Sequence, residues 1–366
     1  MKKSFFLFLF IVLAMSLQAQ YQFTMLSDCN CTAIKNQQNT GTCWSFATSS
    51  FLESELIRTG KPDIDLSEMF FVRTNYQQKA ENYMLRQGKA QFGQGGLAHD
   101  VINALKIGGG VPESVYSGKL AGDNIYDHSE METALKGLLS VIVQQKRPSS
   151  KWLKGFTALM DAYMGNAPEQ FEYNGNQYTP KSFAKDLGLN PNDYVNFTSY
   201  THHPFYSKFV LEIPDNWSNG SFYNVPVDDL VTIAENAIDK GYSVAWDGDV
   251  SERGFSGSQG IAVLPVDAKR SDLFKQPGEE LSPTQVDRQV TFENYSTTDD
   301  HLMHITGIAQ DQNETRYFYV KNSWGEISPY NGYIYMSEPY FRLKTVSLLV
   351  HKNAVPASIR KKLGIR

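Results

Sequence analysis

Apolar residues recur at helical spacing directly after Cys43. Trp44, Ala47 and Phe51 lie three or four positions apart, which is typical of one buried face of a helix. Thr42 is of a residue type that often caps helix N-termini. The pattern therefore predicts a helix that begins at Cys43 and is capped by Thr42.

A different period, the alternation of apolar and polar positions, predicts a strand over residues 302–310 and a second over 316–322. The five residues between them, DQNET, are turn formers, so the two strands should form a hairpin. Such a hairpin would bring Asn322, at the end of the second strand, back beside the histidines at the start of the first. These are His301 and His304, which three positions of a strand would place on opposite faces.

The remaining patterns predict an α+β protein. Residues 36–140 are expected to form a mainly helical half and residues 201–350 a half built on a β-sheet or barrel. Residues 141–200 are interpreted as an insertion and residues 351–366 as a C-terminal tail. Further predicted elements are an entry strand within 20–35, helices over 97–107, 152–164 and 180–186, and strands over 241–248 and 332–337.

Residues 1–19 have the pattern of a secretory signal peptide. Two lysines precede an apolar run from Phe5 to Leu17, and the small residue Ala19 then suits cleavage. As a helix this run would extend about 20 Å, which is short of a bilayer core. We therefore predict export to the periplasm or the extracellular space, with no membrane span in the mature chain, residues 20–366.

Charge and cysteine content narrow the classes of partner. The chain has 366 residues, of which 41% are apolar, enough for a sizeable core. Removing the two lysines of the leader takes the formal net charge from −5 to −7, and no dense basic patch remains, so nucleic acid is not expected as a partner.

Cys29 and Cys31 can form a strained disulfide with each other, can bind a metal, or can stay free. Because no second cysteine pair and no HExxH sequence accompany them, no metal or other cofactor is expected.

Cys43 is the candidate nucleophile, because the unpaired N–H groups at a helix N-terminus stabilise a thiolate. Gln37, six positions earlier, can place its side-chain amide beside the Cys43 backbone N–H, so that both donate to an oxyanion. The Asn322 carbonyl can accept a hydrogen bond from one nitrogen of a histidine and leave the other nitrogen facing the thiol. For the cysteine taken alone, a buried structural role is the alternative.

Three segments resemble the active-site blocks of papain-family cysteine peptidases, in that family's order. They read NQQNTGTCWSF, DHLMHITG and KNSWG and begin at residues 36, 300 and 321. Three more are similar to the bleomycin hydrolase and aminopeptidase C branch: SEMFFVRTNY, FGQGGLAHDVINALKIGGGVPESVY and GYSVAWDGDV, which begin at residues 67, 92 and 241. The resemblance covers most of the mature chain.

The resemblance implies a papain-like fold with the active-site cleft between the two halves. It selects His301 over His304, because the family's histidine stands six residues before a small residue, here Gly307. The catalytic residues that it implies are Cys43, His301, Asn322 and Gln37. The substrate-binding residues that we expect are Gly95, Gly96, Trp44 and Trp324.

The expected activity is that of an exported cysteine peptidase that hydrolyses peptide substrates through a thioester, as an aminopeptidase. The branch also implies a homo-oligomer, a hexamer, and no propeptide. In that branch the final residues enter the cleft and their carboxylate anchors the amino group of the substrate. Here residues 360–366, RKKLGIR, are basic and suit this role poorly. A cysteine endopeptidase, a Cys-His amidase or transpeptidase, and a non-catalytic peptide-binding protein are the alternatives.

Overall fold

The computed structural model describes residues 20–366. The predicted signal peptide, residues 1–19, lies outside the described residues. Within the described part of the chain, no helix combines the length and the apolar character that a membrane crossing requires.

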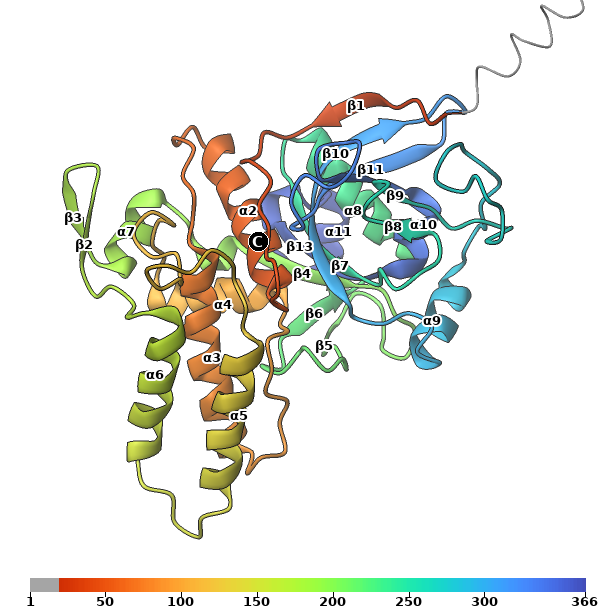
Figure 1. The fold of residues 1–366 in the computed structure, drawn as a ribbon. Helices are drawn as coiled ribbons and strands as arrows, with labels where there is room; N and C mark the ends of the chain where they lie inside the picture. The colour runs from red at the N-terminus through yellow and green to blue at the C-terminus, as the bar shows by residue number, and fades with distance from the viewer. Residues whose placement is uncertain (1–19) are drawn as a thin grey trace, which may run out of the picture.

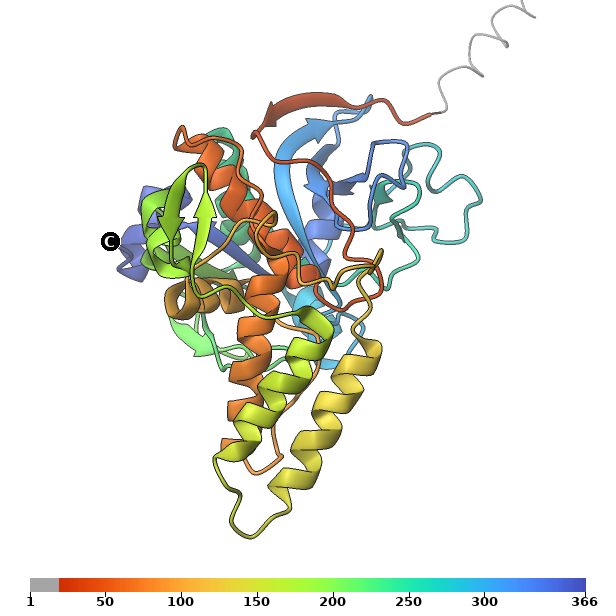
Figure 2. The ribbon, with the colours of Figure 1, turned by 60° about the vertical axis from the view of Figure 1, so that its left-hand side comes forward.

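Three helices of the first half run side by side and form an arm that projects from the rest of the molecule (Figures 1 and 2). They are α3 (Glu68–Leu85), α5 (Ser129–Val143) and α6 (Lys151–Met164). In α5 the buried residues Met131, Leu135 and Leu139 recur every four positions, and in α6 so do Phe156, Met160 and Met164. One stripe of each helix is therefore apolar, and packing these stripes together forms the core of the arm. The helical half also contains α4 (Ala98–Gly108), α7 (Pro180–Leu187) and a hairpin of β2 (Phe171–Tyr173) and β3 (Asn176–Tyr178).

The second half is built on one large, mostly antiparallel sheet. Its strand order is β5 (Lys208–Val210), β6 (Ser221–Asn224), β4 (Tyr194–Thr198), β13 (Thr345–His351), β7 (Val244–Gly248), β10 (His301–Gln310), β11 (Arg316–Lys321), β12 (Tyr333–Ser337), β9 (Ile261–Ala262) and β8 (Phe255–Ser256). The N-terminal strand β1 (Thr24–Asp28) pairs with the second part of β10. The helices of this half are α8 (Val227–Asp239), α9 (Gln285–Glu293), α10 (Glu338–Lys344) and α11 (Ala357–Leu363).

Helix α2 (Cys43–Arg58) lies between the two halves (Figure 1). It packs against α3 and α4 on one side and against β10 and β7 on the other. Every residue from Cys43 to Leu56 is buried, so burial is not confined to the apolar face that the spacing predicted. The polar residues of the helix find partners instead: Ser45 Oγ donates to the Glu68 carbonyl, and the Glu53 carboxylate accepts from the Leu66 N–H.

Most of the predicted elements are confirmed, including the start of α2 at Cys43, helices α4, α6 and α7, and the hairpin of β10 and β11. One boundary is wrong. The segment interpreted as an insertion, 141–200, begins inside α5 and ends beyond β4, which pairs with β13 in the large sheet. The reason is that β4 buries Phe197 in the core of the β-rich half, a contact that local polarity did not indicate.

The C-terminal residues pack against the β-rich half. Ile359 of α11 is buried in its core, and Leu363 and Ile365 pack against the same cluster. The Lys362 ammonium donates to the Tyr206 hydroxyl. The Lys362 ammonium also lies 3.8 Å from the Asp229 carboxylate. The described tail is therefore held to the surface of this half by a small apolar cluster and the polar contacts of Lys362.

Candidate active site

Cys43 is the first residue of α2 and is 9% exposed. Its sulfur accepts a hydrogen bond from the backbone N–H of Leu302 in β10, which places the thiol beside the start of that strand. The predicted cap is wrong in one respect. Thr42 precedes the helix, but its hydroxyl pairs with that of Thr40 at 2.6 Å and makes no capping bond to the helix. The first-turn N–H groups near Cys43 are therefore not all engaged by a capping side chain.

His301 lies at the start of β10 and is oriented by two contacts. Its Nε2 is 2.7 Å from Asn322 Oδ1, and its ring stacks on Trp324 with 4.6 Å between ring centroids. Since the Asn322 oxygen can only accept, Nε2 carries the ring hydrogen and Nδ1 is left with a lone pair. The antiparallel pairing of β10 with β11 brings Asn322 to this position, as the hairpin pattern predicted.

Burial sets the protonation of the two candidate reactive groups. It raises the pKa of the Cys43 thiol to about 12, helped by the negative charges of Asp299, Asp215 and Asp247. It also lowers the pKa of His301 to about 4, although the hydrogen bond that His301 donates to Asn322 acts in the opposite direction. In the unliganded site the thiol and the imidazole are therefore both neutral at pH 7, with His301 Nδ1 able to take a proton.

Gln37 is held by both atoms of its side-chain amide. Its Nε2 donates to the Thr40 carbonyl at 2.7 Å, and its Oε1 accepts from Ser323 Oγ at 2.6 Å. Its backbone N–H also donates to the Ser323 carbonyl at 2.8 Å. The second hydrogen of Nε2 is left to donate elsewhere. Sequence reasoning missed the role of Ser323, although this residue follows Asn322 in the KNSWG segment that was singled out.

The predicted substrate-binding residues occupy different environments. Trp44 is 1% exposed, and its indole N–H donates to the Gln94 carbonyl, so any effect of Trp44 on substrate would be indirect. A Cβ on Gly96 would lie tightly against the Trp44 ring, at 3.1 Å, and one on Gly95 would meet the Asp215 carboxylate at 2.0 Å. The two glycines therefore make room for neighbouring side chains. Trp324 is partly exposed over His301.

His304 faces away from the His301–Asn322 pair and packs against α2. Its Nδ1 is 2.9 Å from Ser50 Oγ, which also accepts from the Lys321 ammonium at 2.7 Å. Burial and the nearby positive charge of Lys321 lower the pKa of His304 and keep it neutral. These contacts are those of a structural residue, in keeping with the choice of His301.

Three carboxyl groups near Cys43, the buried Asp247 and the half-buried Asp299 and Asp215, were not predicted from the sequence. Asp247 and Asp299 hydrogen-bond to each other, which requires a shared proton. Burial raises the pKa of Asp247 to about 7 and that of Asp299 well above its usual range. Asp215 approaches from the loop after β5, and burial raises its pKa too. Such residues lie far apart in sequence, so no local signal reveals the cluster.

Two groups of side chains have the composition of a metal site. Asp65, Glu53 and Glu68 surround the Lys35 ammonium, which already supplies a positive charge. In the second group, His202 and His203 both hydrogen-bond to Glu212 through Nε2, at 3.1 and 2.7 Å.

The tautomer of His202 argues against a metal in this second group. The Gln289 side chain donates to His202 Nδ1, so the ring hydrogen is on Nε2 and points at Glu212. A metal ligand would need a lone pair on that nitrogen. Among the described residues Cys29 and Cys31 are free thiols, and the Cys31 sulfur lies 3.1 Å from the Tyr333 hydroxyl.

Asp247→Asn should change the pH dependence of stability. The native state keeps a proton on Asp247 up to about pH 7, whereas an unfolded aspartate releases it near pH 4. Wild-type stability therefore falls as the pH rises from about 4 to about 7, and asparagine, which resembles the protonated form, removes this loss.

Thermal melting at pH 5 and pH 8 measures this effect. We expect the variant to gain about 2 kcal/mol over the wild type at pH 8 and less at pH 5. Asp63→Asn, at an exposed position, is the matched control and should show the same difference from wild type at both pH values. Equal gains of Asp247→Asn at pH 5 and pH 8 would contradict the assignment.

Comparison with known proteins places these residues in a family. Residues 147–364 match the model of the Peptidase C1-like family, and residues 19–177 match that of the papain family cysteine proteases. The chain is 26% identical over 371 residues to aminopeptidase G of Lactobacillus delbrueckii subsp. lactis, which covers 87% of this chain and 80% of that protein. It is 25% identical over 366 residues to aminopeptidase C of Listeria innocua, with the same two coverages.

A solved structure supports the fold. The crystal structure of PepW from Lactobacillus rhamnosis HN001 superposes with a TM-score of 0.74 at 21% sequence identity, over 93% of this chain and 84% of that one. The expected α+β fold, with a helical half and a β-rich half, is therefore confirmed. Because the family model spans more than half of its residues, the chain belongs to the Peptidase C1-like family of cysteine peptidases.

Proposed function

We propose that this protein is a cysteine aminopeptidase in which Cys43 is the nucleophile and His301 the acid and base. The observation that carries the proposal is the contact of His301 Nε2 with Asn322 Oδ1 at 2.7 Å, beside a cysteine at the start of a buried helix. This contact directs the lone pair of the other ring nitrogen, Nδ1, outward for proton transfer. Gln37, fixed by Ser323, supplies the donor for an oxyanion.

The reaction proceeds by acyl transfer to water. The Cys43 sulfur attacks the peptide carbonyl while its proton passes to His301 Nδ1. The C–N bond then breaks, His301 returns the proton to the leaving amine, and a thioester remains. Water, deprotonated by His301, cleaves the thioester and regenerates the thiol. The amide of Gln37 and the Cys43 N–H stabilise the oxyanion, each donor contributing about 3 kcal/mol in comparable sites.

Removal of single residues from the amino end, rather than internal cleavage, is supported by the relatives. The proteins that this chain matches over 87% of its length carry the names aminopeptidase G and aminopeptidase C. The resemblance suggested that the C-terminal residues anchor the amino group of the substrate. The structure gives no support for this role, because α11 packs against the β-rich half around Ile359. An endopeptidase is the alternative.

Cys43→Ala should reduce peptide hydrolysis to background, a loss on the order of 10⁵- to 10⁶-fold, because no other group replaces the thiol. Mass spectrometry of an unblocked decapeptide should show stepwise loss of N-terminal residues by the wild type. Cys29→Ala and Cys31→Ala are the matched controls and should retain activity. Full activity in Cys43→Ala would contradict the mechanism, and internal fragments from an N-acetylated decapeptide would favour the endopeptidase.

Ser323→Ala should lower kcat by about fivefold with little change in KM. The substitution removes one hydrogen bond to Gln37, and such a bond contributes about 1 kcal/mol. The loss appears in kcat because Gln37 stabilises the oxyanion rather than the bound substrate. Ser149→Ala, at an exposed position between α5 and α6, is the control. An unchanged kcat in Ser323→Ala would show that Gln37 does not depend on Ser323.

We also propose that the enzyme is exported, on the pattern of charged and apolar residues before Gln20. Expressed in full in a Gram-negative host, the protein should be recovered outside the cytoplasm with Gln20 as its first residue. N-terminal sequencing measures this. Recovery of the protein in the cytoplasm with Met1 retained would argue against export.

A further inference from the structure

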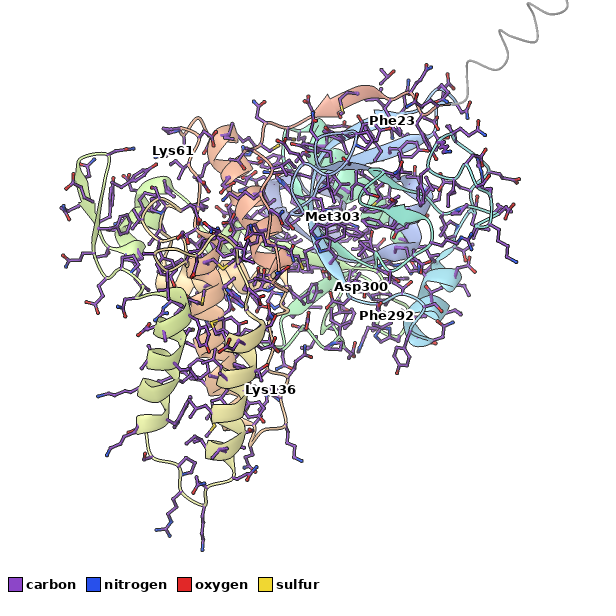
Figure 3. The ribbon with its side chains drawn as sticks, in the orientation of Figure 1. Phe23, Lys61, Lys136, Phe292, Asp300 and Met303 are labelled. Atoms are coloured by element: carbon purple, nitrogen blue, oxygen red, sulfur yellow. The ribbon has the colours of Figure 1, made fainter. Side chains whose placement is uncertain are left out.

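A pocket of about 480 Å³ opens beside the candidate active site. Two segments line it, residues 212–215 and part of residues 292–299. Figure 3 shows Phe292, at the end of α9, and Asp300, just before β10, on the same side of the β-rich half. Its apolar surface comes from Ile213, Pro214, Phe292 and Tyr295. Its carboxyl groups are those of Asp215 and Asp299 and of the exposed Glu212 and Glu293. Neither lysine, arginine nor histidine is among its described lining residues.

The carboxyl groups of the pocket lie close enough to Cys43 for their charge to act on its thiol. Asp299 stands two residues before His301, and its charge and that of Asp215 both raise the pKa of Cys43. Asp247, which hydrogen-bonds to Asp299, is paired across the sheet with Leu302, whose N–H reaches the Cys43 sulfur. A group bound at these carboxyls therefore lies close to the bond that Cys43 attacks.

The carboxyl groups are incompletely satisfied. Asp247 is 1% exposed and accepts from Ser347 Oγ through Oδ2. Apart from the contact between the two carboxyls, Asp247 Oδ1 and Asp299 Oδ2 have no hydrogen-bond partner among residues 20–366. The proton that the two carboxyls share supplies only the contact between them, so a further donor would satisfy their remaining lone pairs.

Lys79, the buried cation whose charge acts on Asp215, does not supply this donor. Lys79 is 3% exposed, and its ammonium donates to the carbonyls of Gly93 and Gly95. Its charge is felt by Asp215, which otherwise accepts at Oδ1 from the Gln91 amide at 2.6 Å. A further positive group with several N–H donors would complement the pocket.

Asp215 also limits how far a substrate can extend. Its carboxylate covers the Cα of Gly95 so closely that a side chain there would lie 2.0 Å from Oδ2. An extended peptide that paired with the Gly95–Gly96 backbone would meet this carboxylate. A free amino terminus gains an ionic hydrogen bond there, whereas an acylated or longer chain brings neutral bulk against a charged group.

We propose that Asp215 and Asp299, supported by Asp247, form the site that binds the protonated amino terminus of the peptide substrate. The inference rests on the proposed function, because it assigns the anchor that would make a cysteine peptidase of this fold an aminopeptidase. The proposed anchor lies in the pocket lined by residues 212–215 and part of residues 292–299. Residues 357–366 take no part in it, since they pack against the β-rich half and none of them lines the pocket.

Charge-neutral variants at the pocket test the assignment. Asp215→Asn and Asp299→Asn should each raise KM for an unblocked aminoacyl-coumarin substrate by about 10-fold, with kcat changed less than about threefold. Glu293→Gln, at an exposed position of the same pocket, is the matched control and should change KM less than twofold. Because Asp215 is only half-buried, its variant keeps the test informative if Asp299→Asn does not fold.

Peptides whose amino terminus is acetylated show whether the pocket binds the amino terminus or a basic side chain of the substrate. An N-acetylated peptide without basic residues should be poor for the wild type and should lose nothing further in Asp215→Asn. An N-acetylated peptide with arginine before the cut should behave in the same way. If the variants lose activity chiefly on this arginine peptide, the pocket binds a basic side chain and the assignment to the amino terminus is wrong.

The remaining outcomes distinguish this inference from the proposed function. Unchanged KM for unblocked substrates in both variants, with activity still dependent on Cys43, would overturn the anchor and leave the peptidase intact. Absence of hydrolysis of every peptide by the wild type, despite labelling of Cys43 by iodoacetamide, would overturn the proposed function and the anchor with it.

Discussion

The candidate site depends on the contact between the start of α2 and the start of β10. Each half of the molecule holds only part of the candidate catalytic set: the helical half supplies Cys43 and Gln37, and the β-rich half supplies His301 and Asn322. Backbone hydrogen bonds join the two sides, from Leu302 to the Cys43 sulfur and from Gln37 to the Ser323 carbonyl. The two halves are therefore joined by hydrogen bonds of the candidate catalytic residues Cys43 and Gln37.

Buried polar contacts strengthen this junction. Lys35 pairs with Glu68 at 2.6 Å, and Lys321 donates to the Thr32 carbonyl and to Ser50. Burial raises the pKa of Glu68 to about 8 despite the nearby lysine. Removing one member of such a group would leave another charged or polar group buried without a partner, which is strongly destabilising. These contacts thus favour one register between α2 and the sheet over alternatives of similar apolar packing.

The surroundings of Gly95 show how a glycine positions the side chains beside the candidate site. The bare Cα admits the Asp215 carboxylate, and the neighbouring Gly96 admits the Trp44 ring. Trp44 in turn holds the Gln94 carbonyl, so the segment beside the cleft is fixed by the second residue of α2. The Asp215 carboxyl and the candidate nucleophile Cys43 are in this way both positioned by α2.

The sequence by itself determined the local elements and the residue types of the reaction. Spacing predicted the helix at Cys43 and the hairpin that carries Asn322, because these follow from short-range periodicity and turn residues. It did not determine the role of Ser323, the membership of β4 in the large sheet, or the packing of α11. It also did not reveal the carboxyl group of Asp215 beside those of Asp247 and Asp299. These features join residues tens to hundreds of positions apart, and only the tertiary structure decides them, since burial and pairing between distant segments leave no local pattern.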